Sequence, residues 1–120
     1  MKQYTETHEW IEIGDNFAIV GITDYAQKEM GDIVYAELPE VGEEVSFGEN
    51  VCELESVKAV APVNSPVTGK ILDVNPALED DPALLNRGPE NEGWLFKIEI
   101  TGESVELMDK AAYDKYLKTL

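Results

Sequence analysis

Closely spaced strand-like segments with glycine and proline corners are the feature that most restricts the fold of this chain. Glu9–Ile13 and Phe17–Ile22 flank a turn of Gly14, Asp15 and Asn16, which predicts a hairpin. Similar short segments continue to residue 100, and no interval between them holds the long helix that parallel strands need for a crossover. The pattern therefore predicts a mainly β fold, either a small barrel or a sandwich.

Turn residues and helix signals place the remaining elements. After the hairpin, strands are expected at residues 32–38, within 41–49, and at 51–55, 60–63, 70–74 and 94–100, with a tight turn at 66–69 and a loop over 75–93. Thr23 is placed to cap a short helix that stops at Gly31, and Asp109 is placed to cap a C-terminal helix. The helices are thus expected to be short and peripheral.

Length and composition indicate a single domain spanning residues 1–120. The chain has 120 residues, of which 43% are hydrophobic and 28% charged, as is usual for a globular domain with one core. No apolar run approaches the ~20 residues that span a bilayer, and the first residues resemble neither a secretory signal nor a transit peptide. We therefore expect a cytoplasmic protein.

The charge of the chain is strongly acidic. Nine lysines and arginines against 25 aspartates and glutamates give a net charge of −16. Such a field repels nucleic acid and anionic membranes, so neither is expected as a partner. Several interpretations of the charge stay open: it favours docking into basic clefts of other proteins, it only keeps the protein soluble and monomeric, or it reflects a salty cytoplasm.

No catalytic or metal-binding constellation is expected. The single cysteine, Cys52, excludes an intrachain disulfide and a cysteine-based zinc site, and its strand pattern predicts a buried thiol. The single histidine, His8, is expected to make a structural hydrogen bond beside Trp10, with a place in a cleft as the alternative. The acidic run at 79–81 lacks the ligand spacing of a calcium loop.

Lys58 is the residue whose position requires a chemical explanation. It lies in Glu55-Ser56-Val57-Lys58-Ala59, at the midpoint of a second predicted hairpin. An unmodified lysine is protonated at neutral pH and a poor nucleophile, and this segment supplies none of the neighbours that activate catalytic lysines. A lysine standing alone at a rigid tip suits covalent attachment better than catalysis. From the spacing alone, an ordinary solvated turn lysine is the favoured alternative.

The same segment resembles the lipoylation motif of the glycine cleavage H-protein family. Further matches run along the whole chain in order: His8-Glu9-Trp10, residues 20–27, 31–34, 38–42, 64–69, 74–75, 77–78 and 92–95. Val57-Lys58-Ala59 is less similar to the Met-Lys-Met of biotin carriers or the Asp-Lys-Ala of 2-oxo acid dehydrogenase lipoyl domains. The resemblance implies a flattened, biotinyl/lipoyl-like barrel-sandwich hybrid with short helices, including a C-terminal one, and Lys58 at a hairpin tip.

By this resemblance, residues 1–120 form a lipoyl-carrier domain and not an enzyme. Lipoic acid would be joined to Lys58 by an amide, and Glu55, Ser56, Val57 and Ala59 would form the turn that the lipoylating enzyme recognises. The five-membered dithiolane ring of lipoic acid cannot adopt the dihedral angle that disulfides prefer, so this strained disulfide opens readily to nucleophiles.

The family's task implies several partners. The carrier, a monomer, would take an aminomethyl group from a pyridoxal-phosphate glycine decarboxylase (P-protein) to a tetrahydrofolate-dependent aminomethyltransferase (T-protein). Dihydrolipoyl dehydrogenase (L-protein) would then reoxidise the dithiol, with NAD as the final acceptor. This assigns the chain to glycine catabolism and one-carbon metabolism.

Two segments depart from the family pattern. Many members have an acidic residue three or four positions after the lysine, where this chain reads Val60-Ala61-Pro62-Val63, and residues 87–93 lack the usual proline–aromatic pair. An acid after the lysine could hold the loaded arm in a cleft, so its loss keeps a second function open: a lipoyl relay that donates lipoate to other lipoyl domains. A third possibility is an unmodified interaction module, against which the intact motif around Lys58 argues.

Overall fold

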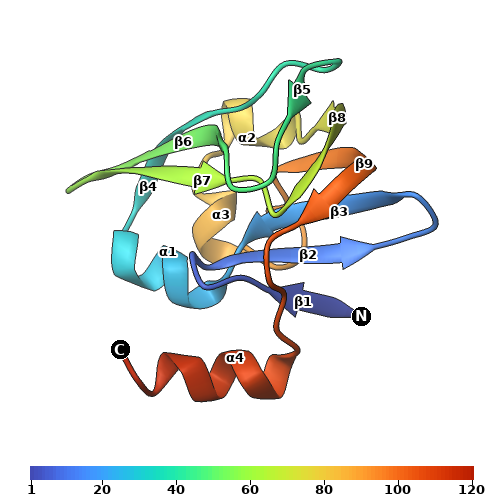
Figure 1. The fold of residues 1–120 in the computed structure, drawn as a ribbon. Helices are drawn as coiled ribbons and strands as arrows, with labels where there is room; N and C mark the ends of the chain where they lie inside the picture. The colour runs from blue at the N-terminus through green and yellow to red at the C-terminus, as the bar shows by residue number, and fades with distance from the viewer.

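The computed structural model describes residues 1–120 as two antiparallel sheets with short helices at their margins (Figure 1). The strands are β1 (Lys2–Tyr4), β2 (Glu9–Ile13), β3 (Phe17–Ile22), β4 (Ile33–Glu37), β5 (Glu44–Val45), β6 (Asn50–Ser56), β7 (Val60–Asn64), β8 (Val67–Val74) and β9 (Phe96–Ser104). The helices are α1 (Asp24–Met30), α2 (Ala77–Asp80), α3 (Leu84–Arg87) and α4 (Lys110–Leu117). The mainly β fold predicted from the sequence is confirmed.

The two sheets share one hydrophobic core. The larger has the strand order β1-β2-β3-β9-β8-β5, and the smaller has the order β4-β6-β7. Inward side chains from both sheets form one cluster, to which the larger sheet gives Ile11, Val20 and Ile98 and the smaller gives Leu54 and Val63. The main apolar core therefore lies between the two sheets, and both contribute to it.

A second, smaller cluster attaches α4. Tyr4 and Tyr113 stack with ring centroids 4.8 Å apart, and Trp10 packs beside them. Asp109 caps the helix by accepting from Ala112 N, and Thr23 caps α1 by accepting from Ala26 N, as the sequence predicted. α1 ends at Gly31, whose φ of 78° favours glycine.

Several sequence predictions were wrong in detail. The expected tight turn at residues 66–69 is the start of β8, and the last strand begins at Phe96 rather than Trp94 and continues to Ser104. The predicted loop contains α2 and α3, single turns that follow Pro76 and Pro82 and bury Leu78 and Leu85. β1 was not predicted, because three residues carry no readable periodicity.

Gly69 explains why the segment after Pro66 is a strand. It pairs with Ile100 next to a bulge, and a Cβ added at Gly69 would lie 1.9 Å from the carbonyl oxygen of Glu99. The glycine is therefore needed because β8 approaches β9 too closely for a side chain, and not because the chain reverses direction there.

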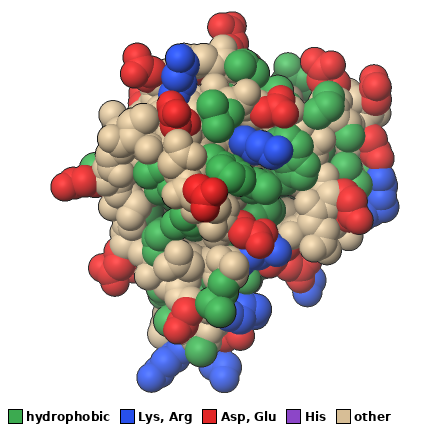
Figure 2. Space-filling view, turned by 90° about the vertical axis from the view of Figure 1, so that its right-hand side faces the viewer, with side chains coloured by type: hydrophobic (Ala, Val, Ile, Leu, Met, Phe, Trp, Pro, Cys, Tyr) green, Lys and Arg blue, Asp and Glu red, His purple; other side chains and the backbone are tan.

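The surface shows how the negative charge is spread. On the face in Figure 2, acidic side chains are scattered mainly around the edge, while hydrophobic side chains gather in the middle. No helix of the structure combines the length and apolarity needed to cross a membrane.

Gly69→Ala should destabilise the fold by about 3 kcal/mol or more, because its new Cβ collides with backbone rather than with a movable side chain. Gly42→Ala is the matched control: no atom lies within 4 Å of its Cβ position, and its φ of 94° costs about 1–2 kcal/mol. Urea unfolding measures both. Equal losses for the two variants would contradict the assignment of Gly69 to close strand packing.

Candidate functional site

Lys58 lies at the tip of the β6–β7 hairpin, which projects at the left of Figure 1. Glu55 pairs with Val60 across the hairpin, so Ser56 to Ala59 form the turn. Val57, Lys58 and Ala59 are exposed, and Val57 is 70% exposed despite being apolar. The predicted hairpin with a central, accessible lysine is confirmed.

Ser56 holds the shape of this turn from inside. Its side chain is buried, and its Oγ accepts hydrogen bonds from the backbone N–H groups of Lys58 (3.3 Å) and Ala59 (3.1 Å). Its own N–H donates to the Ala59 carbonyl over 2.8 Å. The lysine thus projects from a backbone whose polar groups are satisfied locally.

The turn is also braced by the end of α1. Val57 N donates to the carbonyl of Asp32 over 3.0 Å. The Lys58 side chain lies over Gly31, with its Cε 3.4 Å from the position of a Cβ there. Lys58 is therefore exposed, but it does not stand alone as the sequence had suggested. Its aliphatic stem runs along the end of α1.

Asn86 secures that helix end from a distant part of the chain. Its Nδ2 donates to the Gly31 carbonyl and to the side chain of Gln27, both over 2.9 Å, while its Oδ1 accepts from Ile33 N. One half-buried amide thus fixes the junction of α1 and β4 on which Lys58 rests.

A groove of about 320 Å³ opens between α1 and the β6–β7 hairpin. One wall is α1, ending at Met30 beside Gly31, and the other is the hairpin that carries Lys58. Its lining residues are Thr7, His8, Glu9, Ile22, Tyr25, Ala26, Glu29, Met30, Leu54, Ala61, Pro62 and Val63. A chain extending from Lys58 past Gly31 would reach the Met30 end of this groove.

Glu9 is a buried acidic residue in the lining of the groove. The residue is 2% exposed, and its Oε1 accepts from Thr5 Oγ1 (2.6 Å) and Thr7 Oγ1 (2.5 Å), while its Oε2 accepts from Asn64 N (3.3 Å). Burial raises the pKa of Glu9, and these hydrogen bonds oppose the shift without cancelling it. No local pattern in the sequence predicts this site, since Asn64 is 55 residues away from Glu9.

His8 has both roles that the sequence left open: it makes a structural hydrogen bond, to Tyr113, and it lines the groove. Its Nδ1 is 2.8 Å from the hydroxyl of Tyr113, and its ring packs 4.6 Å from that of Tyr25. It also lines the groove, and burial lowers its pKa. The backbone of His8 has a φ of 72°, which is uncommon for a residue other than glycine. Through its contact with Tyr113, His8 connects α4 to the groove.

Cys52 is buried at 2% exposure, and burial raises the pKa of its thiol to about 12. This confirms the expected inert thiol. No group of three or more His, Cys, Asp and Glu side chains is placed to hold a metal ion.

Glu9→Gln should change how stability depends on pH. Because the folded-state pKa of Glu9 is raised, its contribution to stability is fully present below the unfolded value of about 4.3 and is lost as pH rises through the folded value. The free energy of unfolding of the parent should therefore fall relative to that of the variant between pH 4 and 8, measured by urea unfolding. The exposed Glu12→Gln is the control, and parallel curves for Glu9→Gln and the parent would refute the assignment.

Comparisons with known proteins show the family to which the chain belongs. A family model described as "Glycine cleavage H-protein" matches residues 2–120. The glycine cleavage system H protein of Thermotoga maritima is 54% identical over 118 residues, covering 97% of this chain and 95% of that protein. The mitochondrial glycine cleavage system H protein 2 of Arabidopsis thaliana is 47% identical over 116 residues, covering 95% and 74%.

A solved structure extends the match to three dimensions. The crystal structure of a glycine cleavage system H protein from Mycobacterium marinum has a TM-score of 0.92 and 40% identity, covering 99% of this chain and 97% of its own. The chain therefore belongs to the glycine cleavage H-protein family, and it is a non-catalytic lipoyl carrier of that system.

Proposed function

We propose that Lys58 carries the lipoyl group as an amide on its side chain and that residues 1–120 act as one carrier domain. As a glycine cleavage H protein, the chain carries the aminomethyl group from glycine decarboxylase to aminomethyltransferase and then the dithiol to dihydrolipoyl dehydrogenase. The observation that carries the attachment site is the exposed amine of Lys58 on a turn fixed by Ser56. When attached, the lipoyl group supplies a strained disulfide that opens to nucleophiles.

The residues around Lys58 suit a group of that kind. Glu55, Val57 and Ala59 are exposed and available to a lipoylating enzyme, whereas Ser56 is buried and acts through the geometry of the turn. Removal of the lysine charge by amide formation costs no ion pair, because no acidic side chain pairs with Lys58.

The groove beside Lys58 offers shelter to the arm. Met30, Leu54 and Ile22 form apolar parts of its wall. Glu9 is an acidic lining residue, whereas residues 60–63 after Lys58 include no acid. A cationic amine on the arm would find its counter-charge at Glu9, so the lack of an acid at residues 60–63 does not by itself remove a parking site.

We also propose that the protein is monomeric and cytoplasmic. A lipoylating enzyme would be a further partner, and neither nucleic acid nor a membrane would be one. The net charge of −16 supports the exclusion of nucleic acid and membranes.

The relay function remains the second candidate, and the observation that favours it is the absence of an acid after Lys58. Reconstitution with glycine decarboxylase and aminomethyltransferase separates the two, since a protein that only relays lipoate supports little glycine–CO2 exchange.

Lys58→Arg should abolish both lipoylation and carrier activity. The parent, made in cells supplied with lipoate, should gain the mass of one lipoyl amide and support glycine–CO2 exchange with the decarboxylase. Lys58→Arg should gain no mass and show at least a 100-fold lower exchange rate, while the control Lys70→Arg, an exposed lysine of β8, should match the parent. A parent of unshifted mass in the presence of a competent lipoylating enzyme would overturn the assignment.

Ser56→Ala should slow lipoylation without changing the attachment residue. Loss of the Oγ acceptor leaves two turn N–H groups without their partner, which should cost about 1–2 kcal/mol of stability and loosen the tip. Initial rates with purified lipoylating enzyme should fall several-fold, with Ser46→Ala, at an exposed serine, as control. An unchanged rate would show that the enzyme does not require this turn geometry.

A further inference from the structure

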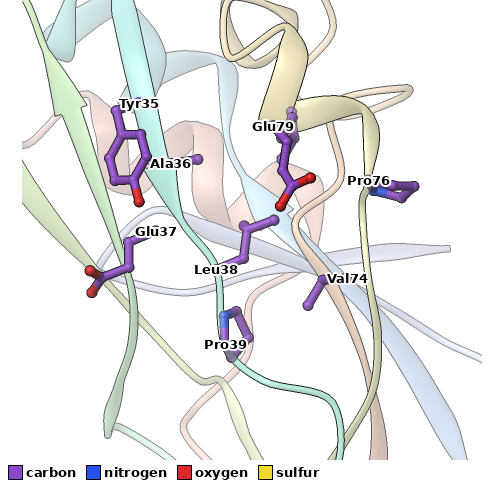
Figure 3. Close-up of a pocket in the computed structure, with 9 residues that line it drawn as sticks. Tyr35, Ala36, Glu37, Leu38, Pro39, Val74, Pro76 and Glu79 are labelled. Carbon is purple, nitrogen blue, oxygen red and sulfur yellow. The ribbon is translucent and has the colours of Figure 1, made fainter.

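The largest hollow of the surface lies along β4, away from the groove beside Lys58. It has a volume of about 550 Å³ and is lined by Tyr35, Ala36, Glu37, Leu38, Pro39, Val74, Pro76, Leu78 and Glu79. In Figure 3, Leu38 and Glu79 point into the space between β4 and the segment from Val74 to Pro76. The carrier function described above does not use this hollow.

β4 borders the hollow with an unpaired edge. The strand is the outer member of the β4-β6-β7 sheet and pairs with β6 alone. The hollow lies on the side of β4 away from β6 (Figure 3). Backbone groups along that free edge can pair with a further extended segment, which is a common mode of peptide recognition.

The side chains of the hollow define what such a segment should contain. Leu38, Val74 and Leu78 are apolar, whereas no lysine or arginine lines the hollow. Glu37 and Glu79 are exposed, and neither forms an ion pair. An alternating segment with apolar side chains and a lysine or arginine is complementary to this arrangement.

A bulge adds an exposed aromatic ring at the border. Ile33 pairs with Ser56 and Tyr35 with Glu55, so Val34 is the extra residue. As a result both Val34 and Tyr35 are about half exposed. Tyr35 stands beside Glu37 on the face of β4 turned away from Leu38 (Figure 3), where it offers an anchor for a partner surface.

We propose that this hollow is a docking site for an extended segment of one of the three glycine cleavage enzymes, with a lysine or arginine between apolar residues. The proposal rests on the carrier function proposed above. Along β6, the segment from Glu53, opposite Glu37, to Ser56 at the turn spans roughly 10 Å. A partner docked there would hold the carrier while Lys58 stays free to enter its active site.

Hydrogen exchange tests the location of the contact. The lipoylated chain is mixed in turn with purified decarboxylase, aminomethyltransferase and dihydrolipoyl dehydrogenase. We expect slower amide exchange at residues 34–38 with at least one enzyme. No protection there with any of the three would overturn the proposal, as would protection that appears at high concentration of the chain alone together with a dimer in sedimentation.

Charge reversal tests the chemistry. Glu79→Lys should raise the KM for the chain about tenfold with the enzyme that protects residues 34–38 and leave kcat unchanged, while Glu103→Lys, exposed on β9 and outside the hollow, should stay within twofold of the parent. Equal effects of the two charge reversals would show that only the overall negative charge of the protein matters, and they would refute docking at this hollow. Intact mass of each variant reports lipoylation separately, so failure at Lys58 and failure of docking are distinguishable.

Discussion

The position of Lys58 depends on the pairing of β6 along both of its edges. β6 bonds to β4 on one side and β7 on the other, and it is the only strand of its sheet with two neighbours. Cys52, Leu54 and Ser56 point inward from it, while Glu53 and Glu55 point outward. The inward set joins the shared core, so the strand that leads into the turn cannot shift without exposing apolar side chains.

That constraint explains how a lysine can be exposed and still well placed. Ser56 is the last inward residue of β6, and its hydroxyl closes the turn. Asn86 fixes the end of α1 against the start of β4, and Gly31 leaves room there for the Lys58 stem. The local flexibility needed by a carrier therefore belongs to the arm, because the backbone beneath it is braced from two directions.

The same two sheets create the two hollows on either side of β6. One lies between the hairpin and α1 and is lined in part by Glu9. The other lies beyond the free edge of β4 and is bordered by Glu37 and Glu79. Because this sheet has only three strands, both of its edges lie near the β6–β7 turn. A site for the lipoyl arm and a docking site can therefore lie on different sides of Lys58 without overlapping.

By itself, the sequence determined the local features of the protein. The first hairpin, the caps at Thr23 and Asp109, the inward set of β6 and the tip position of Lys58 were all predictable, because each depends on residues within a few positions of one another. The motif around Lys58 pointed to the family for the same reason. Segments of three or four residues, such as β1, α2 and α3, were missed because they are too short to show a period.

Only the tertiary structure decided the features that join distant parts of the chain. Gly69 looked like a turn residue until β9 was found against it, and Asn86 carried no visible link to Lys58. Glu9 became a groove residue only when Asn64 was brought beside it, and the hollow along β4 required α2 as its far wall. The physical reason is that burial, close approach and cavity shape are set by strand pairing across long separations, which local patterns do not encode.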